Sequence, residues 1–177
     1  MKKFLTIIGI IIIFFVIYFL QSNFFTWFTI AGIMPNLFVI FILTIGLFIG
    51  KKLGFVFGLL FGIYLDLLVG KSIGISGIML GLIGLAAEYL DRTFSKDSRI
   101  TIMLIVAGST AIYEIGIYVF QIMKWGGIIE ILPFMKILII EIIFNVIITI
   151  ILYPIIQKVG YWAENLFKNK TILTRYF

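Results

Sequence analysis

Long apolar runs, separated by short polar segments, occupy most of this chain and constrain its fold more than any other feature. A helix needs about 20 apolar residues to cross the hydrocarbon core of a bilayer. Most of the runs come close to this length, and charged residues make up only 12% of the chain. A water-soluble domain has about 25% charged residues, which help to cover its surface. The sequence therefore predicts an integral membrane protein and excludes a soluble enzyme.

Six apolar segments are predicted to form an all-α transmembrane bundle within a single domain, residues 1–158. Pro35 precedes the second segment, and proline removes a backbone donor and disfavours helix at the residue before it. We therefore expect a short interfacial or re-entrant piece at residues 24–33. The last segment, 159–177, mixes aromatic and basic residues, which is typical of an amphipathic tail on a membrane surface. The predicted spans are residues 4–20, 36–50, 53–69, 73–90, 100–123 and 134–156.

The basic residues indicate how these spans are oriented. In membrane proteins, lysine and arginine are enriched in the loops on the cytoplasmic side. If six spans alternate, eleven of the 14 basic residues fall on one side and three on the other. The sequence thus predicts six spans with both termini in the cytoplasm. The basic residues lie between apolar runs rather than on a soluble face, so we expect no nucleic acid partner.

The residue types present limit the chemistry of the chain. Without any cysteine or histidine, it has no thiolate or imidazole ligand for a metal. A serine hydrolase would lack its histidine base, and an intramembrane aspartyl protease needs two membrane aspartates, of which only Asp66 qualifies. Gly70-Lys71-Ser72 ends like a phosphate-binding loop, but Leu65 stands where that motif needs a glycine. We therefore expect no enzymatic activity, no cofactor and no metal site.

Glycines recur along the third and fourth predicted spans. In lipid, small residues let helix backbones approach closely and pack by van der Waals contact. The repeat favours packing within the chain, but a face left open for a partner helix has the same pattern, and the sequence does not separate the two. The candidate packing or partner faces consist of Gly54, Gly58, Gly62, Gly74, Gly77, Gly81 and Gly84.

Carboxylates inside three predicted spans form a candidate polar cluster. Charge in hydrocarbon is costly, so such groups face an interior, a cavity or a partner. From the helical rise, Asp66, Glu114 and Glu141 all fall roughly 10 Å below the predicted outer surface. Three ionised carboxylates there would repel, so we expect one to be protonated or hydrogen-bonded to Tyr118 or Asn145. A ligand cavity, a proton or cation site and a purely structural cluster all remain open interpretations.

Three motifs between residues 35 and 85 carry a family resemblance. Pro35-Asn36-Leu37 opens an apolar span, and the run from Gly54 to Leu67 spaces its glycines along a helix that ends in Leu-Asp-Leu. The segment from Gly74 to Gly77 opens the next span. In these motifs, and in its length, span count and basic tail, the chain resembles the MreD family of bacterial rod shape-determining membrane proteins.

This resemblance implies a non-enzymatic scaffold of the cell-elongation machinery in the bacterial cytoplasmic membrane. The implied partners are a bitopic MreC-like protein and, indirectly, MreB filaments and peptidoglycan synthases. It implies no catalytic residue, although Asp66 matches a recurrent family position. An alternative is the substrate-binding S-component of an energy-coupling-factor vitamin transporter, which is also a six-span protein. The short predicted outer loops disfavour that alternative, because they offer few polar groups to cap a ligand.

Overall fold

The computed structural model describes residues 2–69, 72–93, 96–126 and 130–167, and these residues form helices joined by turns and loops, with no strand among them. The predicted all-helical class is therefore confirmed. A short π-helical turn, η1, continues the first helix. The elements are α1 (Lys2–Phe19), η1 (Leu20–Phe24), α2 (Leu37–Phe48), α3 (Lys51–Val69), α4 (Ile75–Thr93), α5 (Arg99–Trp125) and α6 (Ile131–Phe167).

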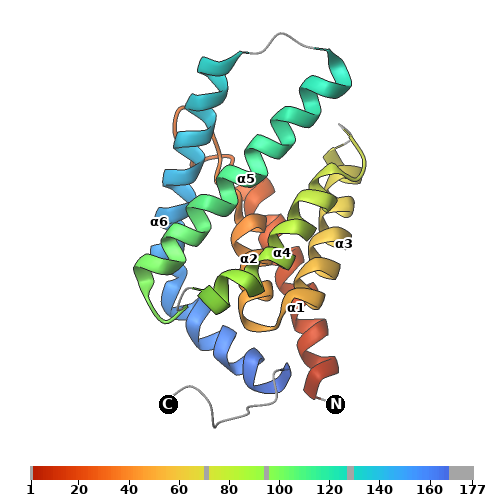
Figure 1. Cartoon of the computed structure of the whole chain (residues 1–177), viewed down its shortest axis with the longest axis vertical. Coiled ribbons are helices and arrows are strands. Elements are labelled where there is room, and N and C mark those ends of the chain that lie inside the picture. Colours follow the sequence, from red (N-terminus) through yellow and green to blue (C-terminus); the bar gives the residue numbers. More distant parts are fainter. Residues whose placement is uncertain (1, 70–71, 94–95, 127–129, 168–177) are drawn as a thin grey trace.

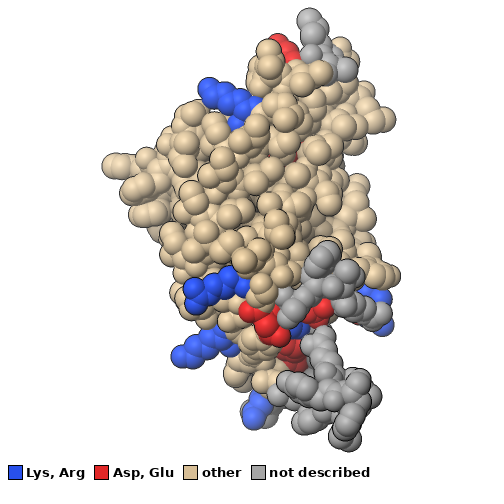
Figure 2. Space-filling view, turned by 60° about the vertical axis from the view of Figure 1, so that its left-hand side comes forward, with Lys and Arg blue, Asp and Glu red and all other residues tan. Residues whose placement is uncertain are grey.

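Within the described part of the chain, three elements are long and apolar enough to cross a membrane: α1 with η1, α5 and α6. The helices α3 and α4 have 19 residues each, which corresponds to about 28 Å. Figure 2 shows charged residues at the two ends of the molecule, mostly at one end, with a wide uncharged band between them. The structure is thus that of a helical membrane protein, while six spans and their orientation stay a prediction.

The helix α2 lies at the centre of the bundle and contacts all five other helices (Figure 1). Ten of its 12 residues are buried, as expected for a helix that is apolar on every side. At about 18 Å it is shorter than the predicted span 36–50. Its start agrees with the sequence pattern, because the Asn36 side chain accepts a hydrogen bond from the Val39 N–H at 3.4 Å.

The antiparallel helices α3 and α4 pack against each other along most of their length. Their glycines face one another across this interface. A Cβ atom added at Gly84 would lie 2.3 Å from the Gly54 carbonyl oxygen, and one at Gly62 would lie 2.4 Å from the Gly77 Cα. Real Cβ atoms do not approach other atoms so closely. These four glycines therefore serve packing within the chain.

The remaining glycines of the two candidate faces have different surroundings. A Cβ at Gly58 would lie 2.5 Å from the Leu80 carbonyl oxygen, so this position is equally tight. Gly81 has more room, because a Cβ added there would lie 3.3 Å from the nearest atom of the Phe55 ring. Gly74 packs against nothing within 4 Å, but its φ of +99° lies in the region that favours glycine. It therefore serves the turn between α3 and α4.

The helix α6 runs for 37 residues and contains Pro154. Proline removes a backbone hydrogen bond inside a helix and bends it. Beyond this position the helix continues to Phe167 and crosses below the other helices toward α1 (Figure 1). Lys3 lies 5.9 Å from the centre of the Phe167 ring. The helix thus passes through the predicted boundary at residue 158, and the rest of the predicted tail, 168–177, lies outside the described residues.

Candidate functional site

A buried amide joins three helices near the middle of the bundle. Asn145 of α6 is 0% exposed. Its Oδ1 accepts a hydrogen bond from the backbone N–H of Asn36 at 2.8 Å, and its Nδ2 donates to Thr110 Oγ1 at 2.9 Å. The Asn36 N–H lies at the start of α2 and has no partner inside that helix. Asn145 therefore satisfies a donor whose burial alone would be costly, and it holds α2, α5 and α6 together.

Two of the three predicted carboxylates lie beside this junction. Glu114 of α5 and Glu141 of α6 are within hydrogen-bonding reach of each other, and the Asn36 side chain reaches Glu141. Glu141 is 6% exposed, and its Oε1 has no hydrogen-bond partner among the described residues. A direct hydrogen bond between two carboxyl groups requires one proton, because ionised carboxylates only accept. Glu141 thus faces the interior of the protein, and the half-buried Glu114 lies beside it.

The third predicted carboxylate, Asp66, occupies a different environment. Its Oδ2 accepts hydrogen bonds from the backbone N–H groups of Gly74 at 2.8 Å and Ser76 at 3.0 Å, at the start of α4. A negative charge is favoured there by the helix dipole and by the unpaired N–H groups of the first turn. Glu88 does the same at the other end of the hairpin, where its Oε2 accepts from the Lys51 N–H at 3.0 Å. Each helix of the α3–α4 hairpin thus carries the cap of the other.

Tyr118, one turn after Glu114 on α5, makes an aromatic contact. Its ring stacks on Phe134, with the ring centroids 4.1 Å apart. Its hydroxyl is buried and has no hydrogen-bond partner among the described residues. The expected hydrogen bond between Tyr118 and a carboxylate is therefore not made within the described part of the chain.

Three neutral residues, Ser76, Tyr113 and Asn36, lie between Asp66 and Glu141. The sequence did not mark all three as site candidates. The Tyr113 hydroxyl is within hydrogen-bonding reach of the side chains of Ser76 and Asn36. Neutral polar residues cost less to bury than charged ones, so they stand out less than carboxylates in an apolar sequence. Two signals were nevertheless present: Asn36 follows a proline before an apolar run, as N-caps do, and Tyr113 is the neighbour of Glu114.

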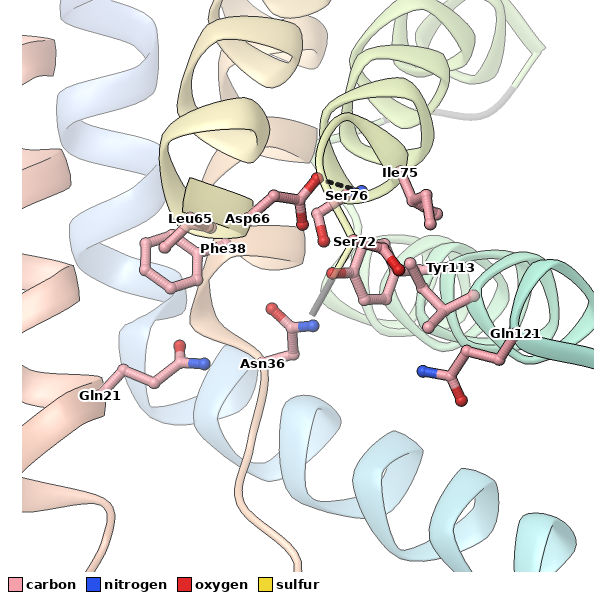
Figure 3. Close-up of a pocket in the computed structure, with 11 residues that line it drawn as sticks. Gln21, Asn36, Phe38, Leu65, Asp66, Ser72, Ile75, Ser76, Tyr113 and Gln121 are labelled. Carbon is pink, nitrogen blue, oxygen red and sulfur yellow. Dashed lines mark hydrogen bonds between the residues drawn. The ribbon is translucent and has the colours of Figure 1, made fainter. Parts of the chain in front are cut away.

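These polar groups border a pocket of about 250 Å³ between α5, η1 and the adjoining ends of α2, α3 and α4. Figure 3 shows Gln21 and Gln121 entering it from opposite sides, with the other polar groups between them. Gln21 also supports the fold, because its Oε1 accepts from the Leu37 N–H at 3.1 Å. The polar lining consists mainly of Gln21, Asn36, Asp66, Ser76, Tyr113 and Gln121.

A second polar cluster lies at the opposite end of the bundle and holds the last turns of α6. Lys96 is 3% exposed, and its Nζ lies 3.2 Å from Asp91 and 2.8 Å from Glu164. The same Nζ is 5.0 Å from the centre of the Phe48 ring. These contacts tie the region between α4 and α5 to the distal part of α6. Asp91 and Lys96 are five positions apart, but no sequence pattern indicates that Glu164, 68 positions after Lys96, joins them.

The described side chains offer hydrogen bonding and fixed helix contacts rather than a catalytic constellation. In the described ranges, no three of the residue types His, Cys, Asp and Glu gather to form a possible metal site. The polar groups instead cap helices, join helices or line the pocket.

Comparison with known proteins supplies the family. The model of a family described as rod shape-determining protein MreD matches residues 2–160. The comparison with curated proteins and the comparison with solved structures each gave no match. The resemblance predicted from the sequence motifs is thereby confirmed. Since the family match covers nearly the whole chain, this protein belongs to the MreD family of rod shape-determining proteins.

Proposed function

We propose that this chain is a non-enzymatic scaffold of the cell-elongation machinery in the bacterial cytoplasmic membrane. In this proposal it binds a bitopic MreC-like protein and, through it, connects to peptidoglycan synthases and MreB filaments. The observation that carries the proposal is the MreD family match over residues 2–160, because that family acts in rod shape determination and is not a known enzyme family.

The arrangement of the helices supports a scaffold role. The hairpin α3–α4 is closed by backbone-to-backbone glycine contacts and by caps at both ends. Such an element has little freedom to rearrange, because packed backbones cannot shift as flexible side chains do. Large apolar side chains are exposed on the outside, including Leu104 at 68% and Met123 at 78%. In a membrane these surfaces contact the lipid bilayer and are available to a single-span partner helix.

A pull-down tests the partner proposal directly. The tagged full-length chain is extracted from its native host in mild detergent, and bound proteins are identified by mass spectrometry. We expect a bitopic coiled-coil protein and cell-wall synthases, enriched over an identically tagged, unrelated polytopic protein. Recovery of paired ATPases with a membrane coupling subunit would instead contradict the scaffold proposal and support the vitamin-transporter alternative.

The proposed topology places both termini in the cytoplasm and has α2 cross the membrane although it has only 12 residues. The absence of native cysteine makes single-cysteine labelling straightforward. With a membrane-impermeant maleimide on intact spheroplasts, we expect labelling of Ser22→Cys and Glu130→Cys. We expect Lys52→Cys and Lys158→Cys to react only after permeabilisation, because both lie on the basic side, which the proposal places in the cytoplasm.

The position of Lys52 decides the role of α2, because it lies just after this helix. If α2 did not cross, Lys52→Cys would react from the same side as Ser22→Cys. That result would leave an odd number of spans and contradict the proposed orientation. The unsubstituted chain, which has no thiol, measures background labelling.

A further inference from the structure

We propose that the pocket between α5, η1 and the ends of α2, α3 and α4 binds a small uncharged molecule that carries several hydroxyl or amide groups, such as a sugar ring. The pocket measures about 250 Å³, slightly below the range of about 300–1,000 Å³ that is usual for drug-sized ligands. A single ring with its substituents is a suitable size for this space.

The number of polar groups is the first argument for a ligand. In a chain that is 63% apolar, three amides, hydroxyl groups and a carboxylate converge on one pocket (Figure 3). Polar groups within a membrane protein are costly unless they bind one another, water or a ligand. A second cavity of about 240 Å³, beside Leu104 and Ile112, has a mostly apolar lining, as expected for a gap between packed apolar helices. The polar pocket is thus unlike that packing gap.

The hydrogen-bonding capacity of the lining defines the kind of group it recognises. The Oε1 of Gln21 is occupied by the Leu37 N–H, so its amide N–H groups remain to donate. The amide of Gln121 both donates and accepts, and the Tyr113 hydroxyl borders the pocket beside Ser76. Hydroxyl and amide groups, which both donate and accept, complement this mixture of donors and acceptors.

The charges around the pocket favour an uncharged molecule. The carboxylate of Asp66 already binds two N–H groups at the positive end of α4. The nearby ammonium of Lys124 donates to Ser72, which also borders the pocket, at 3.0 Å. Among the described residues, one negative and one positive group therefore balance, and the carboxyl pair of α5 and α6 is not part of the lining. A charged ligand would lose its hydration here without gaining an unoccupied counter-charge.

A sugar ring in the pocket has two chemical sources, the headgroup of a glycolipid or a free sugar. Binding is measured on the purified full-length protein in phosphatidylcholine nanodiscs. The probes are glucose in solution and monoglucosyl diacylglycerol in the disc, with plain diacylglycerol as the lipid control. Binding of only the lipid identifies a headgroup site, and binding of free glucose identifies a site reached from solution. Saturable binding of either probe agrees with the proposal.

Two variants connect binding to the pocket. We expect Tyr113→Phe and Gln121→Leu each to weaken binding at least tenfold, because each removes polar atoms from the lining. Tyr118→Phe is the matched control: it removes the same hydroxyl from the same helix, but Tyr118 does not border the pocket. Circular dichroism and thermal unfolding confirm that each variant is folded. Gln121 is exposed, so its replacement tests the site even if Tyr113→Phe is destabilised.

Several binding results would contradict the proposal that the pocket binds an uncharged sugar ring. The pocket is not such a site if neither probe binds, or if binding is the same in wild type and in both pocket variants. Equal weakening by Tyr118→Phe would also contradict it. Glucosamine adds a positive charge to the glucose ring, and glucose 6-phosphate adds a negative charge. We expect each of them to bind at least tenfold more weakly than glucose. Tighter binding of either would show that the site recognises charge.

Discussion

Replacement of Gly84 by alanine is expected to lower the free energy of unfolding by about 3 kcal/mol, the upper part of the usual range for overpacking a helix interface. The added Cβ would lie 2.3 Å from the carbonyl oxygen of Gly54 and 2.4 Å from its carbonyl carbon. Both are backbone atoms, which cannot rotate away as a side chain does. The helices α3 and α4 must therefore separate, and α2 is affected too, because Gly46 packs against Gly84 in the same place.

Gly108→Ala is the matched control for this prediction. It makes the same change inside α5, but nothing lies within 4 Å of the added Cβ. Because glycine inside a helix is less favourable than alanine by about 0.5–1 kcal/mol, we expect this variant to be neutral or slightly more stable. Unfolding of both variants in mixed micelles, followed by circular dichroism, makes the comparison. Equal stability of the two would show that the backbone contact between α3 and α4 is not tight.

Lys96→Met is expected to have the second large effect, with a loss of about 3–5 kcal/mol, as for breaking a buried ion pair. Methionine has a similar length but no charge, so it removes the ammonium that both Asp91 and Glu164 contact. The side chain of Lys96 is 4% exposed, and those of the two carboxylates are 9% and 21% exposed. Water therefore replaces the lost contacts poorly.

The loss of stability in Lys96→Met should appear first in the distal part of α6, because Glu164 lies there. Limited proteolysis after Gly160 is expected to become faster in Lys96→Met than in wild type. Lys158→Met is the control, since Lys158 lies on the exposed side of the same helix segment. If both variants are cut at the wild-type rate, the cluster around Lys96 does not hold this segment. A second change, Glu164→Gln, should restore part of the stability of Lys96→Met by removing one of the two buried negative charges.

Local sequence signals accounted for the helices with good accuracy. The predicted spans 53–69 and 100–123 correspond to α3 and α5 within two residues at each end. These boundaries are marked locally, by Ser98 as the cap of α5 and by Gly126, which has a positive φ, at its end. The end of α6 was not marked in this way. The predicted span ended at residue 156, but the helix continues past Pro154 because Gly160 packs against Phe48 and Tyr161 contacts the same ring.

The candidate site was only partly accessible to sequence reasoning. Equal depth along three helices placed Asp66, Glu114 and Glu141 at one level, but depth does not determine how helices are rotated and spread apart. In the structure only the two glutamates meet, whereas Asp66 turns toward the start of α4. The contact between Asn145 and Asn36 could not be predicted from the sequence either, because the two are 109 positions apart in the chain.

The sequence by itself determined the membrane environment, the helical class, most helix boundaries and the family, because these depend on apolar run length, caps and local motifs. Only the tertiary structure decided which helix is central, which glycines meet and which carboxylates pair. The helix α2 shows the reason: its apolar residues are as compatible with lipid as with protein, so its pattern does not reveal a partner. Contacts with all the other helices bury it, and the elements η1, α3, α4 and α5 also border the polar pocket at its start.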